Sequence, residues 1–110
     1  TSSSTDLAVI EYLKTKIAKN TTVLVILDSD HSKDHVLKEM QLYSQFVTKY
    51  SYLIVEDANI NNHPVFSAHG PGPMEAIEEF VKINNDFVID LTREKFMLTF
   101  NPNGYLKKMF

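Results

Sequence analysis

The sequence contains no cysteine, only 3 glycines and no surplus of basic residues. Without cysteine the chain can form neither disulfides nor thiolate metal sites, which is compatible with a cytoplasmic protein. Any metal ion must then be held by oxygen or imidazole, and such ligands favour Mg²⁺, Mn²⁺ or Ca²⁺ over a structural zinc. The formal net charge of -3 provides no basic surface, so we expect no nucleic-acid partner.

The sequence also lacks a long apolar run. No stretch could span a bilayer, and no charged segment leads into an apolar one as in a signal peptide, so we expect no membrane partner. No Gly-x-Gly turn follows the first predicted strand, where the cradle for a nucleotide or cofactor would lie. Since the 110 residues begin with Thr1 rather than Met, we expect the chain to be part of a longer protein.

Two aliphatic segments, 23–27 and 52–55, organise the rest of the prediction. Both are apolar without alternation, which is typical of strands that are buried on both faces in a parallel sheet. Each segment ends abruptly in polar residues. These are Asp28, Asp30 and His31 after the first segment, and Glu56 and Asp57 after the second.

Apolar residues recur at helical spacing in three other segments. The spacing predicts helices over 6–19, from the N-cap Ser32 to near Tyr50, and over 73–84. Asn20 is expected to end the first helix, because asparagine tolerates the left-handed conformation. Because helices and strands alternate, we predict right-handed crossovers and an α/β fold.

The remaining segments are less regular. Residues 58–73 form a predicted loop, and a loop of this length indicates either a function or disorder. Segments 87–90 and 96–100 are predicted strands of an antiparallel hairpin. After a turn at 101–104, residues 105–106 are expected to return to this hairpin.

The two polar clusters point to one site. In open α/β sheets, ligands bind outside the carboxyl ends of the strands, and neighbouring strands lie ~5 Å apart. Asp28 can therefore share one divalent cation with Glu56 and Asp57. Asp30 can take a proton from a substrate hydroxyl, and His31 can do the same or orient Asp30. The structural alternative is that these acids only cap the next helix or face solvent.

Other polar residues have plainer interpretations. His35 is predicted on the surface of the second helix, and the glutamates of the third helix, including Glu75, on its solvated face. His63 and His69 lie in the long loop, where contact with a ligand stays open.

Four segments, 23–36, 52–57, 70–73 and 98–107, resemble in this order the cephalosporin hydroxylase/rhamnosyl O-methyltransferase family. Its members are class I methyltransferases that use S-adenosylmethionine. The resemblance implies the C-terminal half of a Rossmann-like methyltransferase sheet, with parallel strands, crossover helices and a C-terminal antiparallel hairpin. Residues 1–110 are then one part of a single domain whose N-terminal S-adenosylmethionine-binding half is absent.

The same resemblance implies roles for individual residues. The Mg²⁺ ligands correspond to Asp28, Glu56 and Asp57. Asp30 corresponds to the general base, with His31 beside it, although Asp28 and Asp30 could exchange roles. The candidate contacts to S-adenosylmethionine are Ser4, Thr5 and Asp28. The implied reaction is Mg²⁺-dependent O-methyl transfer to a hydroxyl of a sugar or another small metabolite.

Without the donor-binding half, we expect the fragment to be inactive alone and to associate with the missing half or with a second copy through an exposed sheet edge. Other functions stay open. Asp28-Ser29-Asp30 also resembles the first motif of haloacid-dehalogenase-type phosphohydrolases, although residues 31–56 leave no room for that family's intervening Ser/Thr and Lys. A receiver-type signalling domain and an inactive interaction module are further alternatives.

Overall fold

The computed structural model describes residues 2–95 and 98–110. Within them the chain forms three helices, α1 (Leu7–Lys16), α2 (Lys33–Tyr43) and α3 (Pro73–Ile83). The strands are β1 (Val25–Leu27), β2 (Tyr52–Val55), β3 (Phe87–Ile89) and β4 (Tyr105–Lys108). Two short 3-10 helices, η1 (Ser44–Phe46) and η2 (Leu91–Arg93), follow α2 and β3. The alternation of helices and strands confirms the predicted α/β class.

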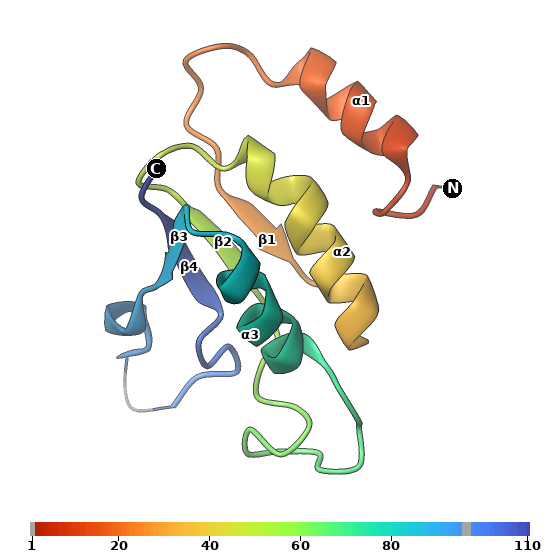
Figure 1. Cartoon of the computed structure of the whole chain (residues 1–110), viewed down its shortest axis with the longest axis vertical. Coiled ribbons are helices and arrows are strands. Elements are labelled where there is room, and N and C mark those ends of the chain that lie inside the picture. The colour runs from red at the N-terminus through yellow and green to blue at the C-terminus, as the bar shows by residue number, and fades with distance from the viewer. Residues whose placement is uncertain (1, 96–97) are drawn as a thin grey trace.

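The four strands form one mixed sheet in the order β1-β2-β4-β3 (Figure 1). β1 and β2 are parallel, with Leu27 paired to Val55, and α2 lies in the crossover between them. β4 is antiparallel to both β2 and β3. The carboxyl ends of β1, β2 and β3 therefore lie at the same edge of the sheet.

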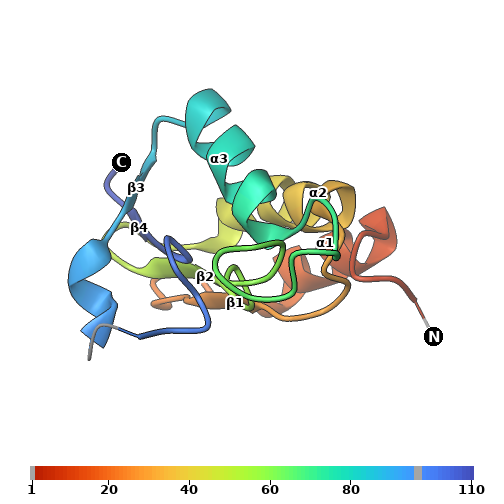
Figure 2. The same cartoon turned by 90° about the horizontal axis from the view of Figure 1, so that it is seen from below.

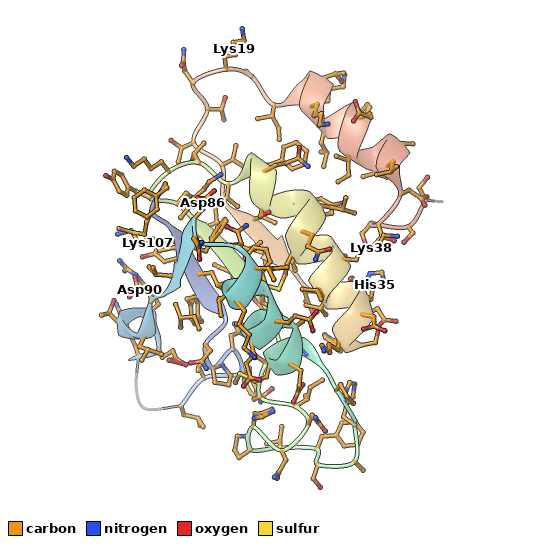
Figure 3. The ribbon with its side chains drawn as sticks, viewed as in Figure 1. Lys19, His35, Lys38, Asp86, Asp90 and Lys107 are labelled. Carbon is orange, nitrogen blue, oxygen red and sulfur yellow. The ribbon has the colours of Figure 1, made fainter. Side chains whose placement is uncertain are left out.

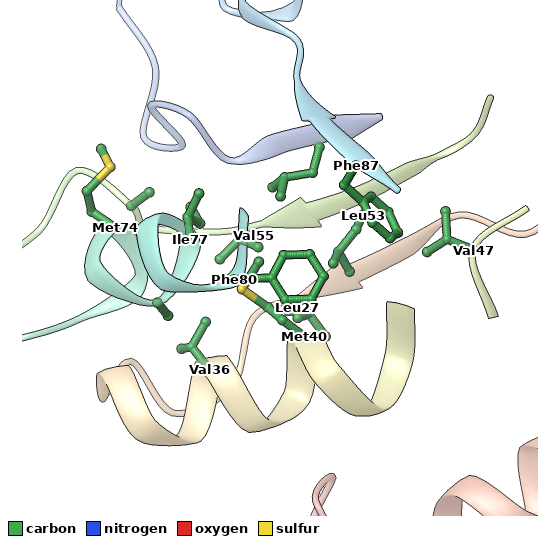
Figure 4. Close-up of a cluster of buried hydrophobic side chains, with 13 residues drawn as sticks. Leu27, Val36, Met40, Val47, Leu53, Val55, Met74, Ile77, Phe80 and Phe87 are labelled. Carbon is green, nitrogen blue, oxygen red and sulfur yellow. The ribbon is translucent and has the colours of Figure 1, made fainter. Parts of the chain in front are cut away.

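Helices α2 and α3 pack next to each other on one face of the sheet, as Figure 1 and Figure 2 show. Between them and the sheet lies the hydrophobic core (Figure 4), whose largest fully buried members include Met40, Leu53, Ile77, Phe80 and Leu106. The ring of Phe80 meets that of Phe87 edge to face, with 5.6 Å between centroids. This packed layer holds the strands in place. It thereby also positions the edge of the sheet at which the acidic residues follow β1 and β2.

The opposite face of the sheet is covered by no helix of the described chain (Figure 2). Leu24 and Ile26 are 48% and 56% exposed, whereas Leu27 points into the core and is buried. The prediction that segment 23–27 is buried on both faces is therefore wrong for this chain, because α2 and α3 cover the same face. β1 is also an edge strand, as expected for a chain with an exposed sheet edge.

The predicted strand over 96–100 is also wrong where the structure describes it, and residues 96 and 97 lie outside the described part. Residues 98–100 are irregular, and β3 pairs with β4 instead. The backbone explains the difference. The carbonyl of Phe100 accepts from the N–H of Asn59 at 3.1 Å, and Thr99 Oγ1 accepts from the N–H of Asn101 at 3.0 Å. These contacts hold the segment against the loop after β2 rather than in the sheet.

The first two helices end earlier than predicted. α1 ends at Lys16 because Ile17 is already extended, although Asn20 does adopt the left-handed conformation with φ 66°. α2 ends at Tyr43 and tightens into η1. The apolar spacing continues through η1 and places Val47 in the core, which made the helix look longer than it is. None of the helices in the described residues has the length and apolar character needed to cross a membrane.

Candidate metal centre

Two loops at the carboxyl edge of the sheet bring Asp28, His31 and Asp57 together. Asp28 follows β1 directly, and Asp57 lies two residues beyond β2. The N–H of Glu56 donates to the carbonyl of Leu27 at 3.0 Å, so the two strands remain paired up to the point where the acids begin. The two polar clusters therefore lie at the same edge of the sheet, as the sequence predicts.

The ligand atoms of this group are close enough to surround one ion. One carboxylate oxygen each from Asp28 and Asp57, and one imidazole nitrogen of His31, all lie within 4.8 Å of one another. His31 Nε2 is 3.0 Å from Asp57 Oδ2 and 3.5 Å from Asp28 Oδ1. Two carboxylates and an imidazole are suitable ligands for a divalent cation, and the partial exposure of all three leaves room for water or substrate oxygens.

The imidazole of His31 provides a test of whether a cation fits. Its Nε2 atom is buried and has no hydrogen-bond partner within the described residues, although it lies 3.0 Å from Asp57 Oδ2. A buried polar atom without a partner is costly. A cation between His31, Asp28 and Asp57 would satisfy this nitrogen and offset the two negative charges. The donor set therefore fits a metal ion.

Glu56 and Asp30 stand apart from this group within residues 2–95 and 98–110. Glu56 directly follows Val55, the partner of Leu27 in the register, and its N–H bonds to the Leu27 carbonyl. Asp30 Oδ1 accepts from the N–H of Ser32 at 2.7 Å. Hydrogen bonds from the Ser32 side chain and backbone hold the pKa of Asp30 below its ordinary value. Ser32 is the N-cap of α2, as predicted, so Asp30 also serves the start of that helix.

The long loop after β2 packs against the ligand group. The carbonyl of Pro71 accepts from the N–H of Lys33 at 3.1 Å, which ties the end of the loop to the start of α2. A Cβ atom on Gly72 would lie 3.2 Å from the carbonyl oxygen of His31 and 3.3 Å from His69 Nδ1. The absence of a side chain at Gly72 thus lets the loop approach His31 closely. His69, whose Nδ1 lies next to Gly72, is not part of the group found among the described residues.

Glu75 holds the same loop from the first turn of α3. Its carboxylate accepts from His63 Nε2 at 2.8 Å, from Asn61 Nδ2 at 3.0 Å and from the N–H of Gly72 at 2.7 Å. Partial burial acts to raise the pKa of Glu75, but these hydrogen bonds outweigh it and lower the pKa to about 2. The prediction that Glu75 lies on a solvated face is therefore wrong. Its position three residues after the Gly72 N-cap is a capping-box spacing that could have indicated this role.

The N-terminal segment lies against α2, on which Figure 3 labels His35. Ser4 Oγ is 3.2 Å from His35 Nε2, and the Tyr43 hydroxyl donates to the Ser4 carbonyl at 2.8 Å. His35 is therefore partly buried rather than a free surface residue. Thr5 Oγ1 lies 3.0 Å from a hydroxyl of its own segment. Ser4 and Thr5 stay predictions as donor contacts.

Two buried side chains that the sequence did not single out support the ligand loops. Glu39 of α2 accepts a hydrogen bond at 2.8 Å from the Oγ atom of Ser29, the residue directly after Asp28. Asn101 Oδ1 accepts from the N–H of Asp57 at 3.0 Å. Glu39 lies three residues after Val36 on the buried face of α2, but a glutamate is seldom buried, and Asn101 lies in a turn, so neither carried a sequence signal for this role.

A family model described as "Rhamnosyl O-methyltransferase/CmcI" matches residues 1–109 of the chain. The chain belongs to this family. The resemblance seen in its motifs is thereby confirmed, and membership of the family favours a methyltransferase over a phosphohydrolase or a receiver domain.

Curated members of the family are similar over most of this chain. The rhamnosyl O-methyltransferases of Mycobacterium tuberculosis and Mycobacterium bovis are each 48% identical over 108 residues, which is 96% of this chain and 44% of theirs. That of Mycobacterium leprae is 48% identical over 86 residues, 76% of this chain and 38% of its own. The chain thus spans less than half the length of these relatives. No solved structure matches the chain.

Proposed function

We propose that this chain carries the metal and acceptor side of an S-adenosylmethionine-dependent sugar O-methyltransferase. The observation that carries the proposal is the convergence of Asp28, His31 and Asp57 at one sheet edge, in a chain of the rhamnosyl O-methyltransferase family. The named relatives act on a rhamnosyl group, so the acceptor proposed for the whole protein is a rhamnosyl-containing glycoside.

Asp28 and Asp57 would hold a divalent cation, Mg²⁺ by the family resemblance, with His31 Nε2 completing the protein's share of ligands. Glu56, which directly follows the last paired residue of β2, is a further candidate ligand. When bound, the cation supplies a positive charge that lowers the pKa of an acceptor hydroxyl and stabilises the developing oxyanion. The protein groups orient the acceptor at the sheet edge, so much of the catalysis is positioning.

Asp30 is the proposed general base. Its Oδ1 atom accepts from the N–H of Ser32, and the side chain is exposed and precedes His31 directly in the sequence. Its lowered pKa makes it a weak base on its own, so it can take a proton only from a hydroxyl that is already acidified. The part of the loop that Glu75 holds, residues 61–72, would form one wall of the acceptor site, since it approaches His31 closely at Gly72.

The methyl donor would bind mainly to the part of the protein outside this chain. The uncovered sheet face, with Ile26 and Val88 exposed, and the free edge of β1 are where that part would pack. Within this chain, Ser4 and Thr5 would add contacts to the donor. The fragment alone is therefore proposed to be inactive.

The test uses the full-length protein with Asp28→Asn and Asp57→Asn variants. We expect both variants to lose Mn²⁺ binding, measured by electron paramagnetic resonance, and to lose methyl transfer from labelled S-adenosylmethionine to a rhamnosyl glycoside. Asp86→Asn is the matched control, because this exposed carboxylate precedes β3 at the opposite edge of the sheet (Figure 3). It should bind Mn²⁺ and react like the wild type. Methyl transfer that persists in both variants and in EDTA would refute the metal role.

A further inference from the structure

Asn101 contacts the backbone of a proposed metal ligand. Its Oδ1 atom accepts from the N–H of Asp57 at 3.0 Å, across 44 residues of sequence. Building on the proposed function, we infer that Asn101 is a positioning residue that fixes Asp57 for metal binding.

Asp57 needs such support because of its backbone conformation. It has φ 55°, in the left-handed region that residues with a side chain seldom adopt. This conformation turns the chain sharply after β2 and brings Asp57 Oδ2 to within 3.0 Å of His31 Nε2. A hydrogen bond to the N–H of Asp57 stabilises the turned peptide, and with it the direction of the carboxylate. Loss of this hydrogen bond would let the ligand oxygen move away from the group.

Asn101 is itself held rigidly. It is only 7% exposed, its N–H donates to Thr99 Oγ1 at 3.0 Å, and its carbonyl accepts from the N–H of Gly104 at 2.9 Å. The donor on Asp57 requires that the amide oxygen faces it, which places Nδ2 3.5 Å from the Tyr105 hydroxyl. The side chain is therefore fixed at both ends.

The turn that carries Asn101 is pressed against β2. A Cβ atom on Gly104 would lie 2.3 Å from the carbonyl oxygen of Val55, and the N–H of Val55 donates to the carbonyl of Gly104 at 2.8 Å. Val55 lies two residues before Asp57, so the turn and the ligand share one rigid frame. Groups that orient metal ligands from outside typically change metal affinity by about 10–100-fold when they are removed.

The experiment measures Mn²⁺ affinity of the full-length protein by electron paramagnetic resonance, with folding checked by circular dichroism. We expect Asn101→Ala to weaken Mn²⁺ binding by about 10-fold or more. Asn101→Asp keeps an acceptor for the Asp57 N–H, so we expect it to bind within about threefold of the wild type. Tyr105→Phe, which removes only the partner of Nδ2, should also bind like the wild type.

The matched control is Asn59→Ala. Asn59 is a buried asparagine, 6% exposed, in the same loop and two residues after Asp57, but it is not the acceptor for the Asp57 N–H. We expect its Mn²⁺ affinity to stay near that of the wild type. If Asn101→Ala does not fold, Asn101→Ser replaces it with the same expectation, because its hydroxyl is too short to reach that N–H.

The outcomes separate this inference from the proposed function. A wild type that binds no Mn²⁺ overturns the metal centre and the inference with it. A wild type that binds Mn²⁺ while Asn101→Ala binds equally well overturns the inference alone. Equal losses in Asn101→Ala, Asn101→Asp and Asn59→Ala also overturn it, because a general packing effect would then explain the result.

Discussion

Replacing Gly104 by alanine should destabilise the protein strongly. The added Cβ atom would lie 2.3 Å from the carbonyl oxygen of Val55 and 3.0 Å from that of Asn101. Backbone atoms cannot rotate away as a side chain can, so β4 must move away from β2. Such a move lengthens the 2.8 Å hydrogen bond from the N–H of Val55 to the carbonyl of Gly104.

The magnitude follows from these two effects. Overpacking at a rigid site costs about 1–3 kcal/mol, and a weakened backbone hydrogen bond adds about 1 kcal/mol. We therefore expect Gly104→Ala to lower the free energy of unfolding by about 2–4 kcal/mol, a large share of the ~5–15 kcal/mol typical of small domains. Urea denaturation at constant pH, followed by circular dichroism, measures this difference.

Gly70 provides the matched control. It has φ 84° and no atom within 4 Å of an added Cβ, so Gly70→Ala tests backbone conformation without crowding. A left-handed alanine costs about 1–2 kcal/mol, which is less than the loss expected at Gly104. The reasoning fails if Gly104→Ala unfolds at the same urea concentration as the wild type, or if Gly70→Ala is the more damaging change.

Three further predictions address the core, the loop and the sheet face. Phe80→Ala should lower the free energy of unfolding by about 3–5 kcal/mol, because the ring is 1% exposed, and a smaller loss in urea denaturation would contradict its place in the core. The pKa of Glu75 is about 2 against an ordinary 4.5, so its stabilising contribution is fully present above pH 4.5 and is lost as the pH falls toward 2. Glu75→Gln should therefore narrow the difference in melting temperature between pH 6 and pH 3, and an unchanged difference would count against the loop contacts. Ile26→Ser should destabilise the full-length protein by more than 1 kcal/mol if another part of the chain covers that face, and a change within about 0.5 kcal/mol, typical of surface positions, would show that the face stays open.

Local patterns predicted much of the fold because they reflect local physics. The aliphatic segments became β1 and β2, Ser32 became an N-cap, and Pro73 begins α3. The errors arose where contacts between residues far apart in the sequence determine the local structure. Segment 98–100 has the composition of a strand, but its backbone groups bond to the loop after β2, at Asn59.

The candidate site divides in the same way. The sequence pattern alone predicts that Asp28 and Asp57 follow two parallel strands, and neighbouring parallel strands have their carboxyl ends at the same edge of the sheet whatever path the chain takes between them. The three-dimensional fold was needed to show that His31 joins them, that Asp30 bonds to the start of α2, and that Asn101 bonds to the N–H of Asp57. Those outcomes depend on the direction of side chains in turns and on a contact across 44 residues, and neither is encoded in a local pattern.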